Sequence, residues 1–288
     1  MRGCLFCGGT GPFTTVEHTV PEALGNDDSV LLGEVCDGCQ SYLGREVEKF
    51  ALSQPPIGPM RALLRIRGKR GKLPTIETSI PERHGGHLPA YDFGSDQGIT
   101  FGVGDDGHLW VAIERPEMVR AIMNGEKTEF KFVLTPKHIA ALGRLLGKMA
   151  LELLCAENPL EAREPRYDEL RRYVRFGVRK EIWLLAYRQA CNYREIIETG
   201  VDGLGPFETV TCYEYGFYDV GTDRIFAFMF GGEVWAISMD GFVPCEASRE
   251  VFASELYRPV WSSREGRGLT DKRYLDEVLL PAQKHLRL

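Results

Sequence analysis

Residues 4–9 read CLFCGG and residues 35–44 read VCDGCQSYLG, so the chain carries two Cys-x-x-Cys pairs close to its start. Each pair presents two thiolates from one tight turn, and two such turns complete the tetrahedral shell of a zinc ion. A redox pair or a chance recurrence is the alternative, but this paired spacing in a cytosolic chain favours metal. We therefore predict one zinc ion per chain, bound by Cys4, Cys7, Cys36 and Cys39.

A site closed by four cysteines leaves no open coordination position, so this zinc is expected to hold structure and not to catalyse. A small head has little hydrophobic core, and metal binding then supplies much of its folding free energy. The prolines of SQPPIGP at residues 53–59 mark a linker. We accordingly expect a zinc domain at residues 1–55 and a larger domain at residues 56–288.

Between the two cysteine pairs lies EHTVPEALGN, at residues 17–26. The succession CxxCG, EHxxPExLG and VCxxCxxxLG resembles the HNH endonuclease family, in its branch with a Glu-His pair and four cysteines. The resemblance covers residues 4–44 and extends more softly to GKMALELL and YDELRRYVRFG further along the chain. It implies a ββα-metal fold that is held together by zinc and is similar to a treble clef. It also implies that the protein hydrolyses phosphodiester bonds in DNA with a divalent metal.

The same resemblance makes His18 the general base and Glu17 a ligand of a catalytic Mg²⁺ or Mn²⁺ ion. The chemistry of the two side chains agrees with these roles. Imidazole has an ordinary pKa of about 6.5, which suits a base at neutral pH. A carboxylate suits a hard divalent cation. Taken by itself, a Glu-His dipeptide is more often an ordinary surface pair, and its place between the zinc pairs is what favours the catalytic interpretation.

The chain departs from the family pattern at two positions. Gln40 follows the last cysteine where the family usually has Asn or His, and the resemblance makes it the second ligand of the catalytic metal. Gln keeps a carbonyl oxygen but adds a methylene. The family's middle Asn has no clear match, because residues 31–33 are Leu-Leu-Gly and Asn26 lies too early. A weak nuclease, an altered metal preference and an inactive nuclease therefore all stay open.

A basic segment, RALLRIRGKRGK at residues 61–72, follows the predicted zinc domain in a chain whose net charge is −6. Clustered cations can track a phosphate backbone even when the whole chain is acidic. A solvated linker or the edge of a sheet explains the same composition. The candidate nucleic-acid contacts are Arg65, Arg67, Lys69 and Arg70.

The rest of the chain has the pattern of an α+β fold, with antiparallel strands and packed helices. Strand-like segments flank GDDG near residue 105, which predicts a hairpin and not a dinucleotide-binding loop. A helix is expected from Thr135-Pro136 to Asn158-Pro159, with Lys148 and Glu152 on the polar face opposite its apolar arc. A second helix is expected over residues 167–176, ended by Gly177.

The composition, 43% hydrophobic and 26% charged, is typical of a globular protein, and no apolar run approaches the length of a membrane span. We expect a cytoplasmic enzyme, an HNH endonuclease that acts on DNA. Two alternatives remain from the sequence. The first is a zinc module that binds nucleic acid or protein with weak or no catalysis. The second is a defence effector whose C-terminal domain senses a ligand or partner.

Overall fold

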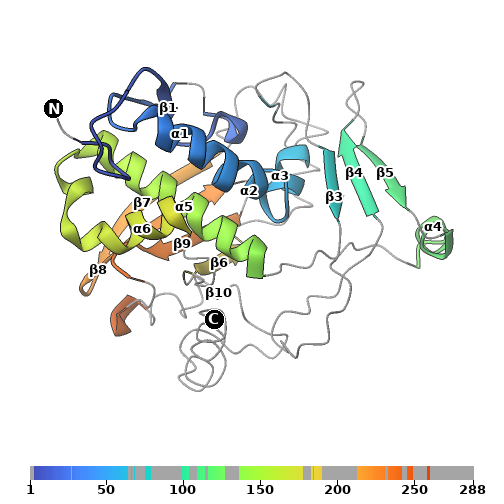
Figure 1. Cartoon of the computed structure of the whole chain (residues 1–288). Helices are drawn as coiled ribbons and strands as arrows, with labels where there is room; N and C mark the ends of the chain where they lie inside the picture. Colours follow the sequence, from blue (N-terminus) through green and yellow to red (C-terminus); the bar gives the residue numbers. More distant parts are fainter. Residues whose placement is uncertain are drawn as a thin grey trace, which may run out of the picture.

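The computed structural model describes residues 3–26, 28–63, 66, 68, 75–78, 99–103, 109–113, 116–126, 136–177, 183, 185–189, 213–230, 233–241, 245–248 and 258–259. Within these residues the chain forms helices and antiparallel sheets, which confirms the predicted α+β class (Figure 1). None of the helices in this part of the chain has both the length and the apolar character that crossing a membrane requires.

The expected zinc domain at residues 1–55, called the head from here on, consists of a short hairpin followed by a helical segment. Strand β1 (Val16–His18) pairs antiparallel with β2 (Val30–Leu32), and the 3-10 turn η1 (Glu22–Leu24) lies in the loop between them. Helix α1 (Asp37–Leu43) follows, and it continues through the π-helical turn η2 (Gly44–Glu48) into α2 (Lys49–Ala51). The head therefore has a β-β-α order, with the first cysteine pair before β1 and the second at the start of α1.

Asp37, the first residue of α1, fastens the chain before β1 to the N-terminus of the helix. Its carboxylate accepts hydrogen bonds from the backbone amides of Thr14 and Thr15, at 2.8 and 3.1 Å, and from both of their hydroxyls. These hydrogen bonds, those from the two hydroxyls first, lower the pKa of Asp37 to about 2. A carboxylate in the first turn also suits the positive end of the helix dipole.

The expectation of a loose linker at residues 53–59 is wrong in its second half, because helix α3 (Ile57–Leu63) begins there. Ile57 and Met60 lie one turn apart and are both buried, so the helix contributes an apolar face to the hydrophobic core. Arg61 donates hydrogen bonds to the carbonyls of Ala23, at 2.6 Å, and Leu52, at 2.7 Å. The first arginine of the basic segment is therefore a structural side chain.

The two helices expected in the middle of the chain are confirmed. Helix α5 is Pro136–Glu157, and α6 is Asp168–Phe176, which ends at Gly177 with a φ of 50°. The 3-10 turns η3 (Glu161–Arg163) and η4 (Pro165–Tyr167) connect them. The predicted apolar arc of α5 is buried along its whole length, at Ile139, Leu142, Leu145, Leu146, Met149 and Leu153.

Helix α5 lies between the head and a large antiparallel sheet (Figure 1). In the described residues this sheet has the strand order β10-β6-β9-β8-β7. The strands are β6 (Leu185–Gln189), β7 (Tyr213–Val220), β8 (Asp223–Phe230), β9 (Glu233–Ser238) and β10 (Arg258–Pro259). One face of α5 contacts β8 and β9, and the other contacts β2, η2 and α2 of the head. Head, helices and sheet thus form successive layers with one continuous hydrophobic core.

A separate three-stranded sheet contains β3 (Thr75–Thr78), β4 (Ile99–Val103) and β5 (Leu109–Ile113), and α4 (Pro116–Met123) follows it. Strands β4 and β5 pair antiparallel, with Ile99 opposite Ile113 and Val103 opposite Leu109. This pairing confirms the expected hairpin, although residues 104–108 at its tip lie outside the described residues.

The layered arrangement corrects one expectation about α5. Lys148 and Glu152 were expected on a polar face, but both are fully buried, with 0% of either residue exposed. The apolar arc packs toward the sheet side, and the head then covers the opposite face near the middle of the helix. A helix between two layers has little solvent-facing surface there, so charged groups on that stretch must find partners in the interior.

Candidate functional site

The four cysteines of the two Cys-x-x-Cys pairs lie together. Their sulfur atoms are all within 4.8 Å of one another, none forms a disulfide, and the Sγ atoms of Cys7 and Cys36 are 3.7 Å apart. Four sulfurs at the usual Zn–S distance of about 2.3 Å in a tetrahedron are separated by about 3.8 Å. The predicted set is therefore brought to a spacing that can hold a metal such as zinc.

Backbone amides and neighbouring thiols favour a charged sulfur in this cluster. The Cys36 amide donates to Cys4 Sγ, and the Gly9 amide donates to Cys7 Sγ, both at 3.4 Å. The contact with Cys39, and then backbone amides, lower the pKa of Cys4 to about 4, while the same contact raises the pKa of Cys39. A metal binds the thiolate form, and Cys4 is the sulfur that these contacts keep charged near neutral pH.

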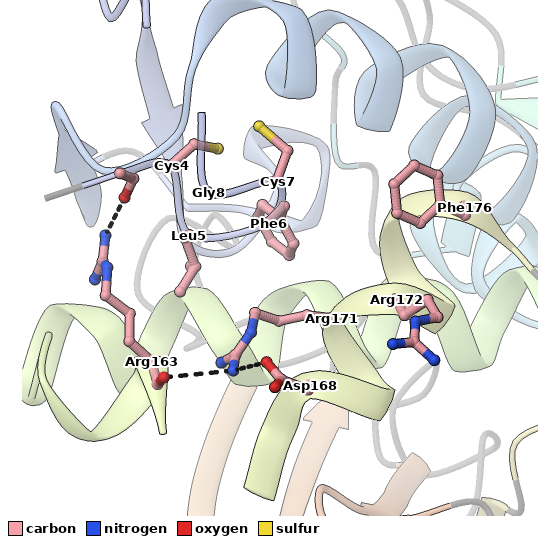
Figure 2. A pocket seen from close by; sticks show the side chains of 11 residues that line it. Cys4, Leu5, Phe6, Cys7, Gly8, Arg163, Asp168, Arg171, Arg172 and Phe176 are labelled. Carbon is pink, nitrogen blue, oxygen red and sulfur yellow. Dashed lines mark hydrogen bonds and ion pairs between the residues drawn. The ribbon is translucent and has the colours of Figure 1, made fainter. Parts of the chain in front are cut away.

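A cavity of about 510 Å³ separates the first cysteine turn from α6, and Figure 2 shows its walls. Two arginines that line it donate hydrogen bonds to other residues of the protein. Arg163 donates to the Gly3 carbonyl at 3.2 Å, and Arg171 donates to the carboxylate of Asp168 at 2.5 Å. Arg172 is exposed on the same helix. The first bond ties the cysteine turn to η3, and the second lies within α6.

The three residues predicted for catalysis line a second cavity, of about 340 Å³. Glu17 and His18 reach it from β1, and Gln40 reaches it from α1. In the register of the hairpin, Glu17 lies opposite Leu31 and His18 lies opposite Val30. The remaining lining residues are Pro21, Glu22, Ala23, Ser41, Gly44, Arg45, Glu48 and Leu52. Residues from β1, α1 and η2 thus meet at one pocket of the head.

Glu17 is the most enclosed of the three, with 5% of the residue exposed. Its Oε1 lies 2.8 Å from the ammonium nitrogen of Lys148, whereas Oε2 is buried and has no hydrogen-bond partner among the described residues. A buried carboxylate oxygen without a partner is unfavourable, and a proton, water or cation bound to it would remove that cost.

His18 is half-buried beside it, and its ring nitrogen Nδ1 is also enclosed without a hydrogen-bond partner in the described part of the chain. The residue's contact with Lys148 is made by its backbone carbonyl, which accepts from Nζ at 3.4 Å. The imidazole ring itself therefore takes no part in the contact between His18 and Lys148.

Gln40 uses its extra methylene to reach the neighbouring strand. Its Nε2 donates a hydrogen bond to the backbone carbonyl of Val16, which ties α1 to β1 beside the cavity. The amide nitrogen is thereby committed to the fold, and the amide oxygen is the atom left to bind a cation.

Sequence reasoning missed Lys148 and Glu48. The Lys148 ammonium lies 2.8 Å from Glu17, 3.0 Å from Glu48 and 2.6 Å from Glu152, and its side chain is completely buried. Burial lowers the pKa of Lys148, but the three carboxylates outweigh it and raise the value overall. Burial raises the pKa of Glu152 well above its usual value, against the pull of Lys148. The i, i+4 spacing of Lys148 and Glu152 is visible in the sequence, but it is equally typical of exposed pairs.

Asn26 holds the loop between the two strands of the hairpin. It is fully buried, and its Nδ2 donates to the carbonyls of Val20, at 2.7 Å, and Ser29, at 2.9 Å. Its Oδ1 accepts from the Ser29 amide at 2.9 Å. This residue, set aside in the sequence because of its position, therefore supports the strand that carries Glu17 and His18.

The candidate nucleic-acid contacts Arg65, Arg67, Lys69 and Arg70 lie outside the described residues. Their role stays a prediction.

Comparison of the chain with models of known protein families, with curated proteins and with solved structures finds no match.

Proposed function

We propose that this protein is a metal-dependent endonuclease of the HNH type that hydrolyses phosphodiester bonds in DNA. The observation that carries the proposal is the cavity shared by Glu17, His18 and Gln40, where the buried Oε2 of Glu17 has no hydrogen-bond partner among the described residues. The four-cysteine cluster beside it supports the same interpretation, because the HNH resemblance requires both features on one ββα unit.

The residues around the cavity suit a hard divalent cation such as Mg²⁺ or Mn²⁺. Glu17 offers a carboxylate oxygen and Gln40 offers an amide oxygen, which are ligands that these ions prefer. The bound cation would stabilise negative charge on the phosphate and on the leaving oxygen. His18 lies next to Glu17 and takes the proton of the attacking water as general base. Lys148 and Gln40 hold β1 from two sides, so these groups keep a constant spacing.

The test is the cleavage of supercoiled plasmid by the purified full chain. We expect nicked or linear product in Mg²⁺ or Mn²⁺, and none when a chelator of divalent ions is added. The variant Glu17→Gln keeps the size of the side chain but removes the anionic ligand, so it should lose at least about 100-fold in rate, as expected when charge stabilisation in a site is removed. Cleavage that persists at the wild-type rate in this variant would exclude the proposed site.

In the four-cysteine site we propose a structural zinc ion, one per chain. Cys39→Ser should lose the zinc and unfold the head, because Cys39 is 1% exposed and the metal supplies folding free energy. Elemental analysis of purified protein, together with thermal unfolding, measures both effects. Cys245→Ser is the matched control, since this thiol lies outside the cluster, and its zinc content should equal that of the wild type. Folded, soluble protein without zinc in either form would contradict the assignment.

A second candidate function is a zinc module that binds nucleic acid without cutting it. One observation favours it: Glu17 is already paired with Lys148, and the amide nitrogen of Gln40 is already bonded to Val16. The plasmid experiment separates the two functions, because a binding module retards DNA in a gel with every metal and leaves it uncut.

A further inference from the structure

The Lys148 cluster contains a carboxylate that neither the sequence motifs nor the HNH resemblance assign. Glu48 stands on η2, and its Oε1 lies 3.0 Å from the Lys148 ammonium. Unlike Glu152, it also lines the cavity that contains Glu17 and His18. Its side chain is 22% exposed, whereas that of Glu152 is fully buried. Of the two further carboxylates on Lys148, only Glu48 therefore faces the proposed reaction site.

Lys148 makes the same kind of contact with Glu17 and with Glu48. It binds Oε1 of each carboxylate, at 2.8 and 3.0 Å, and Oε2 of Glu17 has no hydrogen-bond partner among the described residues. The Glu17 side chain is 7% exposed and its Oε2 is fully enclosed at the cavity wall. A single ammonium thus holds two carboxylates that both line the cavity.

We propose that Glu48 is a second carboxylate ligand of the divalent cation, held beside Glu17 by Lys148. The inference rests on the proposed function, because it concerns the cation of the same cavity. Mg²⁺ is usually bound by one or two carboxylates together with waters and substrate phosphates. Outside the cysteines, the described residues contain no group of three His, Cys, Asp or Glu ligand atoms close enough to share an ion. Waters and substrate phosphates would therefore have to complete the ligand shell of a cation in this cavity.

The arrangement also explains why the cluster contains an excess of acid. One lysine opposite three carboxylates leaves negative charge in the interior, which is unfavourable unless a proton or another cation offsets it. Glu152, the innermost carboxylate, has its pKa raised by burial. The charge of Glu17 and Glu48 is then directed at the cavity, where a divalent cation compensates it.

The test measures Mn²⁺ binding to the zinc-loaded full chain by electron paramagnetic resonance of the free ion. Mn²⁺ does not displace zinc from a four-thiolate site, because thiolates select softer metals. We expect wild type to bind one Mn²⁺, and Glu48→Gln to bind it about 10- to 100-fold more weakly, at least the loss typical for groups that support a metal ligand. Glu152→Gln is the matched control, since this residue touches the same ammonium but does not line the cavity, and its affinity should stay within about threefold.

Zinc content and thermal unfolding of each variant establish that the head is intact. If Glu48→Gln does not fold, Glu48→Asp provides the test, because it keeps the negative charge on a shorter side chain. This variant should also bind Mn²⁺ more weakly than the wild type. Wild-type affinity in the folded Glu48 variant overturns the inference. An equal loss in Glu152→Gln overturns it too, since Glu48 would then act only through the cluster. Loss in Glu17→Gln alone would leave the proposed function standing without Glu48, whereas no Mn²⁺ binding by wild type would contradict both.

Discussion

Replacing Lys148 with Met is expected to lower the free energy of unfolding by about 3–5 kcal/mol, the range typical when one partner of a buried ion cluster is removed. The ammonium is completely buried and lies within 3.0 Å of Glu17, Glu48 and Glu152. Without it, these carboxylates face one another in the interior with no cation among them. Denaturant-induced unfolding of the full chain measures the loss.

The loss should depend on pH in a definite direction. Burial raises the pKa of Glu152, and the variant lacks the Lys148 charge that opposes this shift, so the folded pKa lies further above that of the unfolded chain. A carboxyl with a raised folded pKa binds more protons in the native state, so stability falls as pH rises. The difference in unfolding free energy between the wild type and the variant should therefore become smaller as the pH falls from about 8 to about 5.

Lys137→Met is the control for this experiment. Lys137 is exposed on the same helix, and its ammonium lies 4.3 Å from the centre of the Phe50 ring. A surface cation–π contact contributes about 0.5–1 kcal/mol, so this variant should lose no more than that. A similar loss in both variants would mean that the Lys148 cluster does not stabilise the junction between the head and α5.

His18→Ala is expected to reduce cleavage by about 10²- to 10⁴-fold, the usual contribution of a general base. The imidazole lines the cavity, and the contact of this residue with Lys148 uses the backbone carbonyl, which Ala retains. Zinc content and the melting temperature should therefore stay close to those of the wild type. Single-turnover cleavage of plasmid, measured beside both quantities, separates a chemical role from a packing role.

His138→Ala is the matched control, because His138 lies on α5 outside the cavity with its ring 5.3 Å from that of Phe50. Burial, and then the charge of Lys137, lower the pKa of His138 to about 4, so this side chain is neutral at working pH. Its removal should affect stability more than rate. If His18→Ala cuts plasmid as fast as the wild type, the base lies elsewhere.

Local patterns in the sequence were sufficient for the elements that depend on neighbours along the chain. The spacing of Cys4, Cys7, Cys36 and Cys39 predicted the cluster of four sulfurs, because each Cys-x-x-Cys turn presents both thiols on one side. The period of apolar residues predicted α5, and Gly177 predicted the end of α6, since its φ of 50° is accessible mainly to glycine. The pairing of β4 with β5 followed from the GDDG sequence between the two strand-like segments.

Other features depend on contacts between segments that are far apart in the chain. The Glu-His pair marked Glu17 and His18, but nothing near them indicates that a lysine 130 positions later binds the His18 carbonyl. The motif likewise does not indicate that Glu48 shares their cavity, because that depends on α1 continuing through η2 without a break. Arg61, the first arginine of the basic segment, likewise bonds to carbonyls of the head, which are distant in the sequence.

The sequence by itself therefore determined the four clustered cysteines, the candidate catalytic pair and the helices and strands that local periodicity specifies. The tertiary structure decided which face of α5 is solvated, and it placed Lys148 among three carboxylates where the helix pattern indicated an exposed position. The physical reason is that periodicity records only the contrast between the two faces of a helix. Whether the polar face meets water or another layer of protein depends on packing between distant segments, and there burial converts an ordinary lysine into the centre of an ion cluster.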